Sequence, residues 1–308
     1  MISDGVNASG VFPEVVKTII CKDVRVQRLA YFYLMYYAEF KPEEALLCVN
    51  TLQMHMKSSN PVIRAQSLRV LTSIRLSLLI PIQLLSIDTG VKDSSPYVRK
   101  AAYLGIIKIY QMDSRKKVKL MNFIKTGLGD SSMFSLSAIL AAYWEICPLQ
   151  YDYIQPHFKK YCQCILDMDS WGQVYLLKIL TYFARNQFDD PNKGMDNNST
   201  KVEEDDEDWS EFSDSEEIQT EQRMDPDLSL LLKNANTLLS NANSSVVIAA
   251  ASLIYYCAPE NLKYTISKPL MRTARSKAAK YGSLVVIRTI SQTRPVCISI
   301  LLLFFSNV

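Results

Sequence analysis

Glycine and histidine are both scarce in this sequence. Only nine of its 308 residues are Gly and two are His. The lack of Gly argues against a fold with many tight β-turns, and no glycine-rich loop that could hold phosphate is present. His55 and His157 belong to different parts of the chain, so they do not assemble a nucleophile, base and acid arrangement. These absences argue against an enzyme.

Cysteine pairs with metal-ligand spacing are missing as well. Cys162 and Cys164 lie near His157, but the usual two-residue gap between thiolates is absent and no second pair follows at a suitable distance. We therefore expect no metal and no cofactor. Cys48 and Cys257 lie in apolar, helix-like segments, where a thiol packs as a small hydrophobic group.

Targeting and membrane-spanning segments are also not visible. The first ten residues lack the basic and apolar regions of a secretory signal. The longest apolar run, Val296 to Phe305, is far shorter than the roughly 20 residues that cross a bilayer. The seven Cys are odd in number and scattered, as in a protein of a reducing compartment. We expect a cytoplasmic protein, soluble or peripheral on membranes.

Charge is divided unevenly along the chain. The formal net charge is only +3, but residues 189–227 contain 16 acidic residues against three basic ones, a local net of −13. The rest of the chain therefore carries about +16. A basic body of this kind is attracted to anionic surfaces or acidic partners.

What the chain does contain is a repeat. Asn60-Pro61-Val62-Ile63-Arg64-Ala65 and Ser95-Pro96-Tyr97-Val98-Arg99-Lys100 each open an apolar stripe with helical spacing. Weaker copies begin near Asp23, Asp130, Asp169 and Asn243. Uninterrupted starts are roughly 35 to 39 residues apart, the length of one helical hairpin in an α-solenoid.

The residues at each repeat start predict a helix N-terminus. Asp, Asn or Ser before the apolar run can accept hydrogen bonds from free amides, and Pro61 and Pro96 suit the first helical turn. Shorter amphipathic helices are predicted between them, at 42–56 and 116–128. Small residues such as Gly105 would let neighbouring helices approach closely. The predicted fold is an all-α solenoid of stacked helical hairpins.

These motifs carry a family resemblance. The pattern Asp93-x-x-Pro96-x-Val98-Arg99-x-Ala101-Ala102 is similar to the HEAT/armadillo signature. Leu29–Leu34, the two Pro-containing motifs and Trp171-Gly172-Gln173-Val174 resemble the trunk of the beta subunits, or beta-adaptins, of adaptor protein complexes. An acidic insertion ending in Met224-Asp225-Pro226-Asp227 makes the beta subunits of adaptor protein complex 3 the most similar members. The resemblance covers about Val6 to Pro295.

The resemblance implies a non-enzymatic subunit of a vesicle coat. Such beta subunits pair with a second large, a medium and a small subunit, and a small GTPase recruits the complex to endosomal or Golgi membranes for traffic towards lysosomes. We therefore expect those subunits, the GTPase and an anionic membrane as partners, and peripheral localisation on Golgi and endosomal vesicles. Nucleic acid is not expected, since the many aromatic residues fall on apolar stripes rather than on a basic platform.

The expected organisation has four parts: a helical-repeat trunk at 1–188, an acidic disordered insertion at 189–227, a continued trunk at 228–295 and a divergent apolar tail at 296–308. The relatives are several times longer, with earlier repeats, a hinge and an appendage domain. The tail is interpreted as non-native sequence or a strongly apolar last helix rather than a membrane anchor.

Several charged or modifiable residues are candidates for function. Arg64 and Arg99 either line a groove for phosphates or, as the HEAT-like resemblance implies, bridge neighbouring repeats; we favour the second. Ser213 and Ser215 lie among carboxylates, as substrates of acid-directed kinases do, and the insertion is either autoinhibitory or a passive loop. Lipid headgroups or an acidic partner could be contacted by a basic group that could equally be a solvated face: Arg115, Lys116, Lys117, Lys119, Arg272, Arg275, Lys277 and Lys280.

Two other classes of protein remain as alternatives. One is another helical-repeat scaffold, of the coatomer or transport-receptor type. The other is a basic solenoid that binds phosphate or nucleic acid, because the same positive charge would attract any phosphate.

Overall fold

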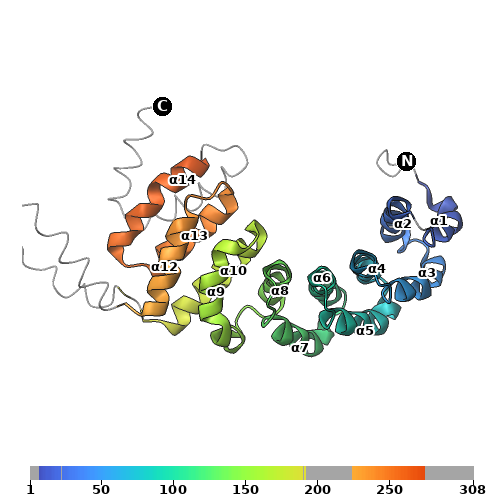
Figure 1. Ribbon diagram of the computed structural model, residues 1–308, viewed down its shortest axis with the longest axis horizontal. Helices are drawn as coiled ribbons and strands as arrows, with labels where there is room; N and C mark the ends of the chain where they lie inside the picture. The colour runs from blue at the N-terminus through green and yellow to red at the C-terminus, as the bar shows by residue number, and fades with distance from the viewer. Residues whose placement is uncertain (1–6, 22, 190, 192–223, 275–308) are drawn as a thin grey trace, which may run out of the picture. The chain divides into compact units, whose positions relative to one another are not determined.

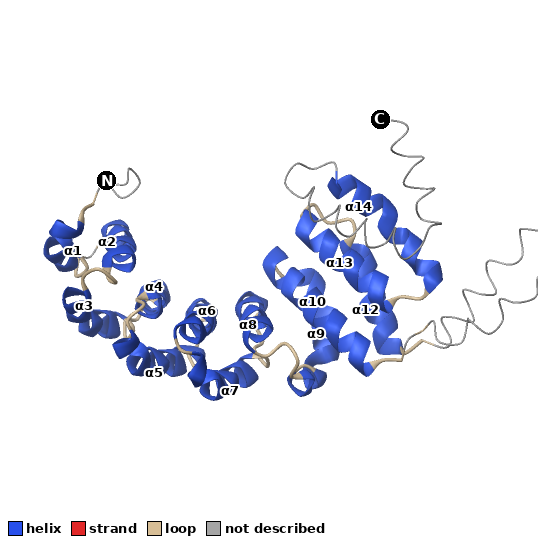
Figure 2. Ribbon diagram, turned by 180° about the vertical axis from the view of Figure 1, so that it is seen from behind, coloured by secondary structure: helices blue, strands red, loops and turns tan. Residues whose placement is uncertain are grey.

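The computed structural model describes residues 7–21, 23–189, 191 and 224–274. Throughout these residues the regular structure is helical and there is no β-strand (Figure 2). The chain divides into two compact units, Met1–Pro148 and Leu149–Val308. This confirms the all-α, HEAT/armadillo-like solenoid that the repeat predicted.

The first unit consists of paired helices in two layers. Helices α2, α4, α6 and α8 lie side by side in one layer, and α3, α5 and α7 form the other (Figure 1). Its elements are η1 (Ser9–Val11), α1 (Phe12–Thr18), α2 (Val24–Tyr37), α3 (Pro42–His55), α4 (Pro61–Ser73), η2 (Ser77–Leu79), α5 (Ile80–Val91), α6 (Pro96–Met112), η3 (Ser114–Lys116), α7 (Lys117–Gly127) and α8 (Met133–Ile146).

The second unit continues the same helical architecture. Helix α13 is central, since it packs on α10, α12 and α14. The elements are η4 (Tyr151–Tyr153), η5 (Gln155–His157), α9 (Phe158–Cys164), η6 (Ile165–Asp167), α10 (Ser170–Gln187), α12 (Pro226–Leu238), α13 (Ser244–Cys257), η7 (Glu260–Ile266) and α14 (Ser267–Ala274). Most of the acidic insertion and the tail at 296–308 lie outside the described residues.

The helices begin where the sequence predicted. The side chains of Asp23, Asn60, Asp169 and Asn243 each accept a hydrogen bond from a backbone amide in the first turn of the helix that follows. At Ser95 the expected hydroxyl cap is not formed. The carboxylate of Asp93 instead accepts from the Ser95 amide at 2.8 Å.

Helix α12 has a cap of its own. It begins at Pro226, where the Asp225 carboxylate accepts from the Asp227 amide at 2.8 Å. The Lys159 ammonium lies 3.5 Å from the Asp227 carboxylate, which links α9 to this helix start.

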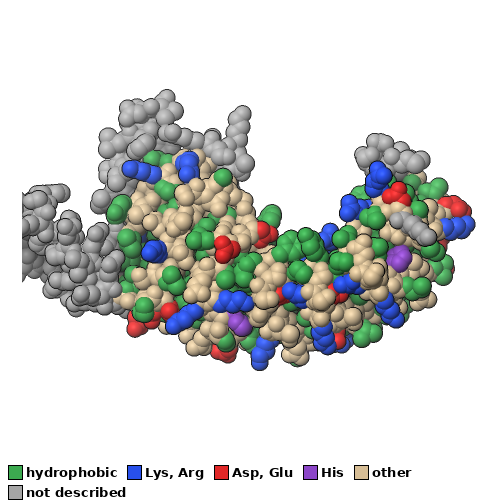
Figure 3. All heavy atoms as spheres, in the orientation of Figure 1, with side chains coloured by type: hydrophobic (Ala, Val, Ile, Leu, Met, Phe, Trp, Pro, Cys, Tyr) green, Lys and Arg blue, Asp and Glu red, His purple; other side chains and the backbone are tan. Residues whose placement is uncertain are grey.

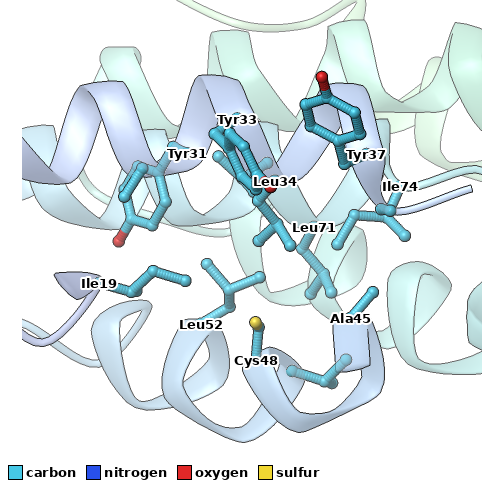
Figure 4. Close-up of a cluster of buried hydrophobic side chains, with 14 of the residues drawn as sticks. Ile19, Tyr31, Tyr33, Leu34, Tyr37, Ala45, Cys48, Leu52, Leu71 and Ile74 are labelled. Atoms are coloured by element: carbon cyan, nitrogen blue, oxygen red, sulfur yellow. The ribbon is translucent and has the colours of Figure 1, made fainter. Parts of the chain in front are cut away.

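Aromatic side chains of α2 occupy the core at the start of the first unit. Tyr31, Tyr33 and Tyr37 are buried in one cluster with Cys48 and Leu52 of α3 (Figure 4). Their hydroxyls remain hydrogen-bonded: Tyr31 lies 2.8 Å from Nδ1 of His55, and Tyr37 accepts from the Ala8 amide at 2.9 Å. The pairing satisfies buried polar groups that would otherwise destabilise the core.

Small residues allow close helix packing in this unit. A β-carbon on Gly105 of α6 would lie 2.9 Å from Cγ2 of Thr72 on α4 and 3.3 Å from Cδ1 of Ile87 on α5. Those distances leave no room for a side chain. The expectation that Gly105 permits close approach is confirmed.

The repeated arginines connect successive repeats. Arg64 donates from Nε and Nη2 to the two carboxylate oxygens of Asp93, each at 2.9 Å, and from Nη1 to the carbonyls of Ser58 and Ser59. Arg99 repeats the arrangement with Asp130 at 2.7 and 2.9 Å. Both guanidiniums are mostly buried and bound within the protein, which confirms the structural role.

Candidate functional site

The most concentrated positive charge predicted from sequence lies at the start of α7. We call Arg115, Lys116, Lys117 and Lys119 the α7 basic segment. All four side chains are exposed. Lys and Arg side chains are visible along the edge of the first unit over α5 and α7 (Figure 3).

One member of the α7 basic segment is already paired. The Nε of Arg115 donates to the Asp113 carboxylate at 2.9 Å, and this hydrogen bond holds the pKa of Asp113 below its usual range. Within the described part of the chain, no carboxylate forms an ion pair with Lys116, Lys117 or Lys119. The three ammonium groups are thus available to an external anion.

The position of these cations on the helix is electrostatically unfavourable. Helix N-termini carry a partial positive charge and favour acidic residues. Helix α7 has no acidic residue in its first turn, and its N-cap residue, Lys116, makes no side-chain cap. An anionic ligand at this place would relieve repulsion among the side chains.

The second predicted basic group behaves differently. Arg272 of α14 donates from Nη2 to the carbonyls of Leu239 and Asn241, at 2.8 and 3.1 Å. It therefore ties α14 to the chain that follows α12. Arg272 and the α7 basic segment belong to different units. Five other candidates lie outside the described residues: Ser213, Ser215, Arg275, Lys277 and Lys280.

The cysteine and histidine residues considered for metal binding have structural surroundings. Burial raises the pKa of the Cys162 thiol to about 12, and the His157 ring packs against Tyr161 with centroids 5.7 Å apart. Among residues 7–189 and 224–274 that are described, no group of three or more His, Cys, Asp or Glu side chains is placed to hold a metal ion. Burial also lowers the pKa of His55.

Sequence reasoning missed one polar cavity in the first unit. It lies between the C-terminal ends of α4 and α6 and includes Arg75 and Lys108. Ser73 and Lys108 occupy equivalent positions in successive hairpins, 35 residues apart like Arg64 and Arg99, but their spacing alone does not reveal a cavity. No described helix combines the length and the apolar character that spanning a membrane requires.

Paired helices, guanidinium links between repeats and exposed charge define an α-solenoid scaffold of the HEAT/armadillo type. The sequence matches the family described as the adaptin N terminal region over residues 1–301. The chain therefore belongs to the adaptin family. This membership supports the expectation that it is not an enzyme.

Comparison with individual relatives shows which adaptins this chain resembles. The chain is 38% identical over 300 residues to the AP-3 complex subunit beta-1 of Canis lupus familiaris, covering 96% of this chain and 27% of the relative. It is 36% identical over 326 residues to the AP-3 complex subunit beta of Dictyostelium discoideum, covering 96% and 28%. The chain thus spans about a quarter of the length of these relatives. Its predicted resemblance to this subunit is confirmed.

A structural comparison agrees. A homology model of the full-length AP-3 complex in an intermediate open conformation matches with a TM-score of 0.58 and 27% identity. The match covers 94% of this chain and 47% of that chain. The described fold is therefore that of an adaptin trunk.

Proposed function

We propose that this chain acts as the trunk portion of a beta subunit in a vesicle-coat adaptor complex, without catalytic activity, for intracellular protein transport and cargo sorting towards lysosomes. The observation that carries the proposal is the match along nearly the whole chain to AP-3 beta subunits, on a helical-repeat fold. A solenoid suits this role because its stacked hairpins present a long surface on which other subunits can lie.

The proposed partners are a second large subunit, a medium subunit and a small subunit of the same complex. Co-expression of the full chain with these subunits, followed by affinity purification through a tag on the chain, tests this directly. We expect all of them in the eluate. Recovery of nucleic acid or of nuclear transport cargo in their place would contradict the proposal and favour one of the two alternative classes.

A small GTPase and an anionic membrane are proposed as further partners, with localisation at Golgi and endosomal vesicles. The support is electrostatic, since each Lys or Arg near an anionic leaflet contributes on the order of 1 kcal/mol. The three unpaired ammonium groups of the α7 basic segment are the best placed of the described cations. We propose that this segment contacts lipid headgroups.

Liposome co-sedimentation tests the membrane contact. Changing the α7 basic segment to Gln at all four positions should lower partitioning onto phosphatidylserine vesicles at low salt by roughly tenfold or more. A matched control changes Lys17, Arg25, Lys57 and Lys92, which are also exposed and remove the same charge. Equal losses in both variants would show that only net charge matters and would contradict a localised contact.

Phosphorylation at Ser213 and Ser215 remains a proposal. Phosphate would add about 1.5 to 2 negative charges at each serine. Incubation of the chain with an acid-directed serine kinase and mapping by mass spectrometry should find phosphate on both. A Ser213→Ala and Ser215→Ala chain that incorporates as much phosphate as the original would contradict this assignment.

A further inference from the structure

A polar cavity lies between the last turns of α4 and α6. Its volume is about 440 Å³, within the range of sites that take small molecules. It is distinct from the α7 basic segment, and none of the motifs recognised in the sequence accounts for it. The lining residues are Thr72, Ser73, Arg75, Lys108, Gln111 and Met112.

Lys108 is held in the wall of this cavity. Its Nζ donates a hydrogen bond to Oγ of Ser73 at 2.6 Å, and that hydroxyl in turn donates to the carbonyl of Arg69 at 2.6 Å. An ammonium group carries three N–H donors, so this arrangement fixes its position and uses only one of them. The remaining donors have no acceptor from the described residues.

Two guanidinium groups add to the positive charge. Burial lowers the pKa of Lys108, and the positive charges of Arg69 and Arg75 lower it further. Arg75 has one weak ion pair, 3.8 Å from Glu39, in which both side chains are half or more exposed. Within the described residues, neither Lys108 nor Arg69 has an ion-pair partner.

The helix dipole alone does not explain this cluster. Cations are favoured near helix C-termini, but that attraction requires neither partial burial of an ammonium nor two guanidiniums beside it. Desolvation and like-charge repulsion both destabilise the arrangement in the empty protein. A bound anion would remove both penalties.

We propose that the cavity binds a small compound carrying two or more phosphate groups, such as an inositol polyphosphate. The guanidinium of Arg75 in the wall matches phosphate oxygens with paired N–H donors, and Lys108 supplies a fixed point charge. Arg69 is not in the wall, but its positive charge acts on Lys108 and adds to the attraction for an anion. The cavity is larger than a single phosphate needs, and three cations exceed the charge of one phosphate monoester.

Calorimetric titration of the full chain with inositol hexakisphosphate and with pyrophosphate tests the site. Lys108→Met keeps the length of the side chain and removes two charge-assisted hydrogen bonds, so we expect at least about tenfold weaker binding. Arg69→Gln, at an exposed position, removes a nearby positive charge and should weaken binding to a smaller extent. Lys57→Met is the control: it removes the same charge before the start of α4, about 20 Å along that helix from the cavity.

A second experiment with vesicles distinguishes a lipid headgroup from a free soluble ligand as the source of the phosphate groups. Phosphatidylcholine vesicles containing a bisphosphorylated inositol lipid are compared with the soluble compounds. Binding only to vesicles, still weakened by Lys108→Met, identifies a lipid headgroup; binding to soluble inositol hexakisphosphate identifies a free ligand. The proposal is overturned if the original chain binds neither, if Lys108→Met and Lys57→Met bind equally well, or if a doubly phosphorylated peptide binds more tightly than both.

Discussion

Gly127 and Tyr103 pack so closely that a side chain at position 127 would have no space. A β-carbon on Gly127, the last residue of α7, would lie 2.7 Å from Cε1 of Tyr103 on α6 and 2.9 Å from Cγ1 of Ile139 on α8. Tyr103 is one of the largest fully buried side chains, so its ring cannot move aside easily. The absence of a side chain at Gly127 therefore allows α7 to pack closely against α6 and α8.

Gly127→Ala should destabilise the protein. Overpacking a dense core costs about 1–3 kcal/mol, which exceeds the ~1 kcal/mol that Ala gains over Gly in a helix interior. Urea unfolding followed by circular dichroism would measure the loss. Gly10→Ala serves as control, because a β-carbon there meets nothing within 4 Å. Equal stability of the two variants would contradict the packing argument.

Asp130→Ala tests the link between repeats. The Arg99 guanidinium loses its carboxylate partner while its side chain stays 16% exposed, so the free energy of unfolding should fall by about 2–4 kcal/mol. Glu14→Ala breaks a pair with Lys17 in which both side chains are more than 70% exposed. That control should change stability by less than about 0.5 kcal/mol. Thermal unfolding of both variants gives the comparison.

Acid should weaken the same links. Burial alone would raise the pKa of Asp93 and of Asp130, but hydrogen bonds from Arg64, Arg99 and backbone amides outweigh it, so both values are lowered. A lowered folded-state pKa contributes stability that is complete above the unfolded value, about 3.9, and is lost as pH falls through the folded value. We expect the urea midpoint to drop below about pH 4. An Asp93→Asn, Asp130→Asn chain should show a smaller drop over the same range, and an unchanged drop would contradict the assignment.

Thiol reactivity should follow burial. Burial raises the pKa of Cys48 and Cys147 to about 11 and that of Cys162 to about 12, whereas Cys21 is exposed. At about pH 8, iodoacetamide should modify Cys21 and spare the other three, because the thiolate is the reactive form. Peptide mapping by mass spectrometry reads each site separately. In urea all four should react, and modification of Cys162 in the folded chain at the rate of Cys21 would contradict the described packing.

Local chemistry explains which parts of the fold were predictable. Asn60 followed by Pro61 predicts the start of a helix, and α4 begins at Pro61. The ladder role of Arg64 was implied by the resemblance of the repeat to the HEAT/armadillo signature, and the structure shows the ion pair with Asp93. These features depend on neighbours in sequence or on one repeat length.

Other features depended on contacts that sequence spacing does not reveal. Lys108 of α6 donates to Ser73 of α4 in the preceding hairpin, so the polar cavity forms only when these two helices pack together. Arg272 is exposed, as a surface cation should be, but the sequence did not reveal that it donates to the carbonyls of Leu239 and Asn241 after α12. A sequence shows which residues are charged, but only the fold shows which groups those charges contact.

Asp93 performs two tasks with one carboxylate: it receives Arg64 from the preceding hairpin and holds the Ser95 amide at the start of its own. Asp130 does the same with Arg99 and the Ser132 amide. Fraying of one hairpin consequently loosens the first turn of the next. The hairpins linked through Asp93 and Asp130 should therefore unfold in a single cooperative transition on heating, with no populated partly folded intermediate.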